Sequence, residues 1–199
     1  MSADKIHVDE VDVDISLVGR LLAAQFPQWA DLPIVPVHSA GTDNALYRLG
    51  SGMVVRLPRI KGAAGQIDKE QRWLPRLAPH LPLAIPVPLE KGVPDEGYPW
   101  QWSIYPWLPG ENATIVPITD PDQAARDLAH FIAALQRIDP TGGPPPGPHN
   151  FFRGVPLSTR DTQTRTAIAS LHDMLDTRAV TEAWEGALQA PAWGGPPVW

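Results

Sequence analysis

The sequence predicts an α+β fold: a small mixed lobe of strands and helices, followed by a lobe of helices alone. Hairpin signals and strand-type alternation occur only before residue 109, whereas the periodic segments after residue 119 repeat at the three- and four-residue steps of a helix. Apolar residues make up 43% of the 199 residues, enough for one domain or for two small lobes that share a cleft. We therefore expect a first lobe over residues 1–106 and a mainly helical second lobe over residues 107–199.

Five extended segments are expected in the first lobe. Residues 45–49 and 53–57 give the strongest hairpin signal, because a Gly-Ser-Gly turn joins two alternating runs. Residues 34–40 and 85–89 are shorter strand candidates. Residues 99–108, PWQWSIYPWL, are dense in aromatic and β-forming residues, and their prolines indicate an edge position or a strand that leaves the sheet.

Helices are predicted in both lobes. In the first lobe they cover residues 14–26, where Asp14 can cap the start, and residues 64–77. In the second lobe, residues 120–138 begin with Asp120 followed three residues later by Gln123, which matches a capping box. Two further helices are expected, and their ranges are 159–177 and 180–189.

Composition limits the kind of partner. A formal net charge of −6 argues against nucleic acid or an anionic membrane as the main partner. No apolar run reaches the roughly 18–20 residues of a spanning helix. The acidic first residues lack the apolar core of a signal peptide, so we expect a cytoplasmic protein. The chain has no cysteine, which excludes disulfides, thiolate catalysis and cysteine-ligated metals.

A glycine-containing turn and a mid-strand arginine form the first candidate site. The turn at residues 39–44 can bring backbone N–H groups close to a phosphate, or it can simply join two strands. Alternation along the next strand places Val55 and Leu57 on one face and Arg56 on the other. Arg56 can neutralise phosphate groups there, or it can be a solvated arginine of an edge strand.

A helical carboxylate and the aromatic segment add to this site. Glu70 lies one turn from Ile67 and from Leu74, near the apolar seam of its helix. Its carboxylate therefore needs a partner, for which Arg56 is the natural candidate; the alternative is a solvated charge on the helix flank. Residues 103–111 can offer backbone groups and apolar walls to a flat ring, or they can pack as aromatic core.

Taken in this order, these motifs resemble those of the aminoglycoside phosphotransferase-like proteins, which share the protein-kinase fold. The resemblance rests on the glycine-bearing turn, the strand V-x-R-L-P, the helix K-E-x-x-W-L and the crossing that ends in L-P-G-E. It covers essentially the whole chain, including residues 148–154, which look like the region before the family's catalytic loop. It implies a kinase-like N-lobe with an antiparallel sheet and a helix, followed by an incomplete, mainly helical C-lobe.

The resemblance also implies a nucleotide site. Arg56 would stand where the family usually has a phosphate-contacting lysine, and Glu70 would orient it. Pro106 would offer its carbonyl group to the adenine amino group, a role that needs no N–H, and Leu108 would offer its N–H to the ring. The loop that covers the nucleotide would consist of Gly41, Thr42, Asp43 and Asn44.

The implied activity is ATP- or GTP-dependent phosphorylation, assisted by Mg²⁺, of a hydroxyl group on a small molecule, with an aminoglycoside as one candidate acceptor. However, the family's catalytic loop, H-G-D-x-x-x-x-N, and the metal-binding aspartate after it do not occur in the sequence. We expect those groups, the metal ligands included, downstream of Trp199. This chain alone is therefore expected to be inactive, because phosphoryl transfer needs a group to orient the acceptor and carboxylates to hold the metal.

Two other functions stay open. The chain can be a non-catalytic nucleotide-binding module or a truncated remnant, which uses Arg56, Glu70 and residues 104–108 to bind without transfer. It can also be an interaction fragment that associates through helix faces left uncovered in its incomplete C-lobe.

Overall fold

The structure is a computed structural model, and it describes residues 10–37, 41, 43–113, 115–195 and 197–199. It divides into two compact units, one of Met1–Asp139 with Val198–Trp199 and one of Pro140–Pro197. The lobe boundary at residues 106–107 that the sequence suggests stays a prediction. Within the described ranges, no helix is both long and apolar enough to cross a membrane.

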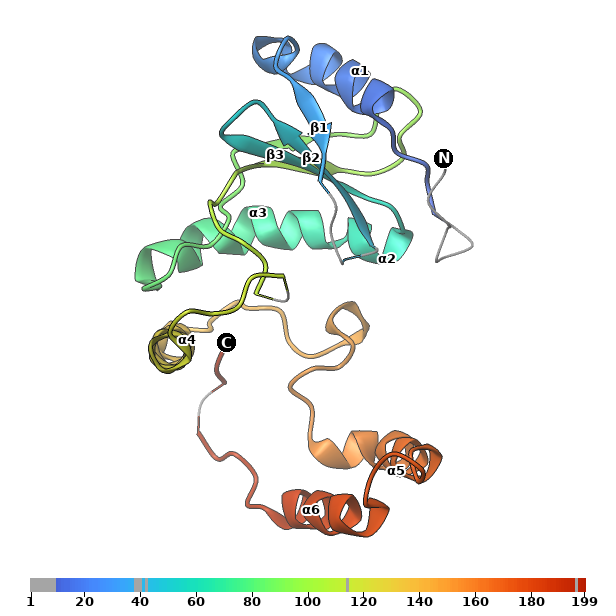
Figure 1. Ribbon diagram of the computed structural model, residues 1–199, viewed down its shortest axis with the longest axis vertical. Coiled ribbons are helices and arrows are strands. Elements are labelled where there is room, and N and C mark those ends of the chain that lie inside the picture. Colours follow the sequence, from blue (N-terminus) through green and yellow to red (C-terminus); the bar gives the residue numbers. More distant parts are fainter. Residues whose placement is uncertain (1–9, 38–40, 42, 114, 196) are drawn as a thin grey trace. The chain divides into compact units, whose positions relative to one another are not determined.

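The first unit is built on a five-stranded antiparallel sheet with the order β1-β2-β3-β5-β4. The first three of these strands are labelled in Figure 1. The predicted hairpin is confirmed, since β2 and β3 pair from Leu49↔Met53 to Asn44↔Pro58. The strands are β1 (Ile34–Pro36), β2 (Asn44–Leu49), β3 (Met53–Pro58), β4 (Glu90–Gly92) and β5 (Trp102–Pro106).

Two strand predictions need correction. The segment 85–89 forms no strand; β4 begins directly after it, because Pro86 and Pro88 lack the N–H groups that a ladder needs. The aromatic segment does form a strand, β5, which ends at Pro106, so the chain leaves the sheet there as one of the two predicted alternatives had it; the other alternative, an edge position, is wrong, because β5 lies between β3 and β4. The predicted strand 34–40 is shorter as β1, and residues 38–40 fall outside the described residues.

The hydrophobic core lies on one face of this sheet, beneath helix α1 (Ile15–Gln25) (Figure 1). The predicted cap of this helix is confirmed, because an Asp14 carboxylate oxygen accepts the N–H of Leu17 at 2.7 Å. A short 3-10 turn, η1 (Pro27–Trp29), follows the helix. The buried core residues of α1 and its end are Leu17, Val18, Leu21, Leu22 and Phe26, and those of the strands are Tyr47, Leu49, Val55, Leu57, Trp102 and Ile104.

The opposite face of the sheet meets helix α3 (Gln66–Leu77), which follows the short helix α2 (Lys61–Ala64). The predicted helix 64–77 is confirmed over most of its length. Gln71 of α3 donates to the Ser103 hydroxyl oxygen at 3.2 Å and to the Glu90 carbonyl oxygen at 3.3 Å, so α3 is fixed to both β5 and β4. The 3-10 turn η2 (Ala78–His80) continues from the end of α3.

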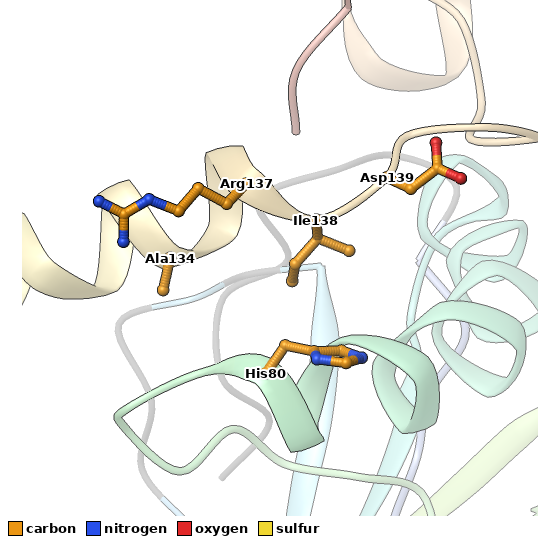
Figure 2. Close-up of a pocket in the computed structure, with 5 residues that line it drawn as sticks. All are labelled: His80, Ala134, Arg137, Ile138 and Asp139. Atoms are coloured by element: carbon orange, nitrogen blue, oxygen red, sulfur yellow. The ribbon is translucent and has the colours of Figure 1, made fainter.

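Helix α4 (Pro121–Arg137) completes the first unit, as the sequence predicts. One half of the predicted capping box forms: an Asp120 carboxylate oxygen accepts the N–H of Gln123 at 2.9 Å, but the Gln123 side chain donates to Asp127 instead of returning to the cap. A surface hollow of about 470 Å³ adjoins the end of α4 and η2 (Figure 2). Its lining consists of His80, Ala134, Arg137, Ile138 and Asp139.

Among its described residues, the second unit contains helices and no strand: α5 (Asp161–Ser170) and α6 (Thr177–Gln189) are preceded by the 3-10 turns η3 (Pro148–Asn150) and η4 (Leu157–Arg160). Both predicted helices exist, but their bounds differ. The helix predicted for residues 159–177 ends at Ser170, and α6 begins at residue 177 instead of 180. The cause is Asp176, whose carboxylate oxygen accepts the N–H groups of Arg178 and Ala179 and so starts a new helix.

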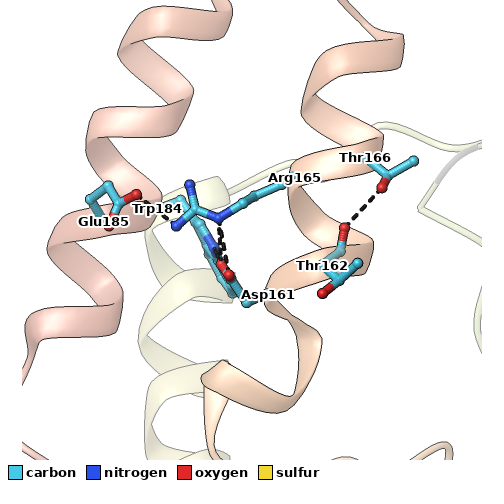
Figure 3. A network of polar contacts seen from close by, with 6 residues as sticks. All are labelled: Asp161, Thr162, Arg165, Thr166, Trp184 and Glu185. Carbon is cyan, nitrogen blue, oxygen red and sulfur yellow. Dashed lines mark hydrogen bonds and ion pairs between the residues drawn. The ribbon is translucent and has the colours of Figure 1, made fainter.

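A polar network joins the two helices of the second unit (Figure 3). One carboxylate oxygen of Asp161 accepts from the indole nitrogen of Trp184 at 2.7 Å and from Arg165 Nε at 2.8 Å. Arg165 also reaches Glu185 at 2.6 Å, so the guanidinium bridges α5 and α6. The hydrogen bonds from Trp184 and then from Arg165 lower the pKa of Asp161 below its ordinary value.

We predict that Asp161→Asn lowers the free energy of unfolding of the chain at pH 7. A carboxyl pKa that is lower in the folded chain gives stabilisation that is present above the unfolded value of about 3.9 and is lost as the pH falls through the folded value. The difference between the variant and the wild type should therefore shrink below about pH 3.9. Urea unfolding followed by circular dichroism measures it, with the exposed Asp173→Asn as a matched control; an equal effect of both variants would contradict the assignment.

Candidate functional site

A hollow of about 450 Å³ lies on the face of the sheet opposite the core. Four of the residues that the sequence singles out line it: Arg56, Glu70, Pro106 and Leu108. The rest of the lining is largely apolar and consists of Leu46, Val54, Leu74, Pro86, Tyr105 and Trp107. The hollow therefore combines one ion pair with walls that suit a flat apolar ring.

Strand pairing explains why these side chains share one face. Leu46 pairs with Arg56 across β2 and β3, and Val54 pairs with Tyr105 across β3 and β5. Because side chains alternate along a strand, Arg56 projects to the side opposite the buried Val55 and Leu57, as predicted.

The charged partner predicted for Glu70 is confirmed. Arg56 Nη1 donates to Glu70 Oε2, and the two side chains are 21% and 23% exposed. Burial lowers the pKa of Arg56, but the hydrogen bond and the charge of Glu70 outweigh it and raise that pKa. Arg56 is thus a permanent cation, which Glu70 of α3 holds against one wall of the hollow.

Tyr105 is the member of this cluster that sequence reasoning missed. Its hydroxyl donates to the same Glu70 oxygen that accepts from Arg56. Burial first, and then the hydrogen bond to Glu70, raise the pKa of Tyr105 to about 12, so the hydroxyl remains a donor near neutral pH. The available signal was its two-residue spacing from Ser103, which places both residues on the face of Arg56.

The end of β5 presents main-chain groups beside the hollow. Trp107 N–H donates to the Gly52 carbonyl oxygen at 2.8 Å, directly after the pair Met53↔Pro106. Residues of an antiparallel ladder alternate between bonded and non-bonded pairs, so the main-chain groups of Pro106 face away from β3. A proline is tolerated at this place because no ladder N–H is lost, and its carbonyl oxygen stays available on that side.

The residues after Pro106 complete this edge of the hollow. Within the described part of the chain, no hydrogen bond engages the N–H of Leu108. The Trp107 ring lies beneath the guanidinium of Arg48, with 4.1 Å between the guanidinium carbon and the ring centroid. Arg48 also donates to the Ser51 carbonyl oxygen, so it ties the hairpin turn to the segment after β5.

The described residues of the predicted covering loop are not among those that line the hollow. Gly41 and Asp43 are exposed residues ahead of β2, and Asn44 is the first residue of that strand, on the face of Leu46 and Arg56. The Asp43 carbonyl oxygen accepts the N–H of Arg59 at 2.7 Å, which anchors the start of the hairpin. Thr42 lies outside the described residues. A nucleotide-covering role for this segment stays a prediction.

Metal ligands are a separate question. Among the described residues, no group of three or more His, Asp or Glu side chains is arranged to hold a metal ion. Glu70, the carboxylate of the hollow, is already engaged by Arg56 and Tyr105. The described residues therefore give a cation and main-chain groups for an anionic ligand that carries a ring.

A model of the phosphotransferase enzyme family matches residues 34–199. Among solved structures, the GDP complex of wild-type aminoglycoside 2'-phosphotransferase-IIIa is 18% identical, with a TM-score of 0.63 over 90% of this chain and 60% of that chain. The apoenzyme of macrolide 2'-phosphotransferase MphH from Brachybacterium faecium is 22% identical, with a TM-score of 0.53 over 92% of this chain and 62% of that one.

The GDP and kanamycin complex of APH(2")-IIia is also similar, at 18% identity and a TM-score of 0.60, over 87% of this chain and 59% of that chain. These likenesses confirm the predicted kinase-like fold. The chain spans about 60% of the length of the first of these structures. Among curated proteins, none matches the chain.

We predict that Arg56→Met costs about 1–3 kcal/mol of the free energy of unfolding at pH 7, because Glu70 would keep a half-buried carboxylate without its cation. Urea unfolding followed by circular dichroism at pH 7 measures this loss.

Arg20→Met is the matched control for this variant. Arg20 pairs with Glu96 at 3.1 Å, but the two side chains are 52% and 37% exposed, so that ion pair should contribute about 0–1 kcal/mol. Equal losses for Arg56→Met and Arg20→Met would contradict the view that the Arg56–Glu70 pair is set apart by its burial.

Proposed function

Because the chain belongs to the phosphotransferase enzyme family, we propose that the hollow beside β5 binds a purine nucleoside triphosphate, ATP or GTP. The observation that carries the proposal is the ion pair of Arg56 and Glu70 inside a mostly apolar hollow. A permanent cation held on one wall suits phosphate groups, and apolar walls suit a base.

In this proposal each part of the hollow contacts one part of the nucleotide. The carbonyl group of Pro106 accepts from the base, and the N–H of Leu108 donates to the ring. Leu46, Val54 and Leu74 enclose the ring from the strands and from α3. The guanidinium of Arg56 contacts phosphate oxygens, and residues 41–44 close over them from the start of the hairpin.

The arginine suits this task although the related family pattern has a lysine. A guanidinium carries five N–H donors in a planar fork, and the contact with Glu70 uses Nη1. The remaining donors can bind phosphate while the ion pair stays intact. Glu70 then acts as the group that orients Arg56, and it contacts no phosphate itself.

The acceptor in the proposed reaction is a hydroxyl group of a small molecule, of the aminoglycoside or macrolide kind. Support comes from the family match and from the fold shared with phosphotransferases that act on these two antibiotic classes. Mg²⁺ would bridge the phosphates and neutralise developing charge. The described residues of this chain supply the nucleotide contacts, and they supply no ligand cluster for that metal.

We predict that the 199-residue chain binds nucleotide without transferring phosphate, because the sequence lacks the motif H-G-D-x-x-x-x-N. Millimolar ATP or GTP should raise the melting temperature by a few degrees, as expected for a ligand present well above its Kd. With kanamycin and labelled ATP, no labelled product should form. A chain that transfers the γ-phosphate would contradict the second part, and an unchanged melting temperature with both nucleotides would contradict the first.

A second candidate function is an interaction fragment, and the surface of α4 favours it. Leu128 and Ile132 lie one turn apart on this helix and are 55% and 45% exposed. Exposed apolar side chains that lie together on a helix can contribute to a surface that associates. Light scattering tests the idea: concentration-dependent dimers that Leu128→Glu abolishes would support it, whereas a monomer at 100 μM or above would contradict it.

A further inference from the structure

We propose that Tyr105 is a positioning residue of this site: its hydroxyl restrains Glu70 so that Arg56 keeps donors free for phosphate. The inference rests on the proposed nucleotide function and deepens it. It concerns a residue that neither the motif pattern nor the family match assigns to the phosphate side of the hollow.

Three separate elements bring their side chains to one oxygen atom. Arg56 comes from β3, Glu70 from α3 and Tyr105 from β5. Both Arg56 Nη1 and the Tyr105 hydroxyl donate to Oε2 of Glu70. The carboxylate is thereby held from two sides, by one charged and one neutral donor.

The second donor decides how the carboxylate meets the guanidinium. An unrestrained carboxylate facing an arginine tends to take two parallel hydrogen bonds, one to each oxygen. In this structure, only the contact from Nη1 to Oε2 joins the two charged groups among the described residues. The Tyr105 hydroxyl gives Oε2 its second hydrogen bond and holds the Glu70 carboxylate so that it contacts the guanidinium through one oxygen only. The other guanidinium donors of Arg56 therefore stay available to a phosphate.

The position of Tyr105 supports a role on this face. It pairs with Val54 across the strands, lines the hollow and has a side chain that is largely buried. Since burial and Glu70 raise its pKa to about 12, the hydroxyl keeps its proton over the working range of pH. A phenylalanine would fill the same volume and lack only the hydroxyl.

The test is Tyr105→Phe in the full 199-residue chain, with binding of ATP, GTP, adenosine and guanosine measured by calorimetry. If the hydroxyl acts through Glu70 on Arg56, affinity for the nucleoside triphosphate that the wild type binds should fall about 5- to 20-fold, which is less than for the loss of a direct hydrogen bond to a charged group because the effect is indirect. Affinity for the matching nucleoside, which has no phosphate, should change less than twofold.

Tyr98→Phe is the matched control. Tyr98 is 1% exposed and donates to the Pro58 carbonyl oxygen at 2.7 Å, but it packs in the core on the other face of the sheet. Its loss of a buried hydroxyl should lower the melting temperature and leave all affinities within twofold. A merely structural role for Tyr105 predicts the same pattern as Tyr98, with no difference between nucleotide and nucleoside.

The outcomes separate the inference from the function beneath it. Suppose that the wild-type chain binds nucleotide, and that Tyr105→Phe either lowers the affinities for nucleotide and nucleoside equally or changes neither affinity. The positioning role is then wrong, and the proposed function stands. If the wild type binds neither ATP nor GTP, the proposed function fails and the inference fails with it.

A double variant tests whether Tyr105 acts through Glu70. In a Glu70→Gln background, Tyr105→Phe should have no further effect on nucleotide affinity; additive losses of affinity would overturn the route through Glu70.

Discussion

The pairing of β3 with its two neighbours is the constraint on which the rest of the first unit depends. β3 lies between β2 and β5, and side chains alternate along each strand. The register of the three strands therefore decides which of their side chains face the core and which face the hollow. Val55 and Leu57 enter the core beneath α1, while Val54 and Arg56 line the hollow. A slip of one residue would bury the guanidinium in the core and expose the apolar set, so the core enforces the register of the site.

The ion pair of Arg56 and Glu70 then links the sheet to α3 across the hollow. Taking both groups out of water has a cost that offsets much of their attraction, so this pair is poorly explained as a device for stability. The hydrogen bonds from Gln71 to Ser103 and Glu90 already fix the helix to the sheet. What the pair adds is a cation in a defined place on an apolar surface, which is a property of a binding site.

Local patterns were sufficient for part of this arrangement. Alternation predicted the hairpin and the face of Arg56, and helical spacing brought Glu70 to it. Apolar periodicity gave wrong element bounds where another local signal was stronger. Prolines displaced the strand expected at residues 85–89, and the Asp176 cap started a helix earlier than apolar spacing indicated. Tyr105 was missed because an aromatic-rich strand does not by itself reveal which of its side chains face the core; Trp102 and Ile104 do, and Tyr105 does not.

The departure from the related family pattern at position 56 is connected to Tyr105 through Glu70. A lysine at position 56 would have one ammonium group, and a carboxylate could contact it at only one place. An arginine offers a fork that a mobile carboxylate can occupy with both oxygens, which would leave less of the guanidinium for a phosphate. A hydroxyl that engages the same carboxylate oxygen removes that competition without adding charge. The arginine of β3 and the tyrosine of β5 therefore form one unit, joined by the carboxylate that both contact.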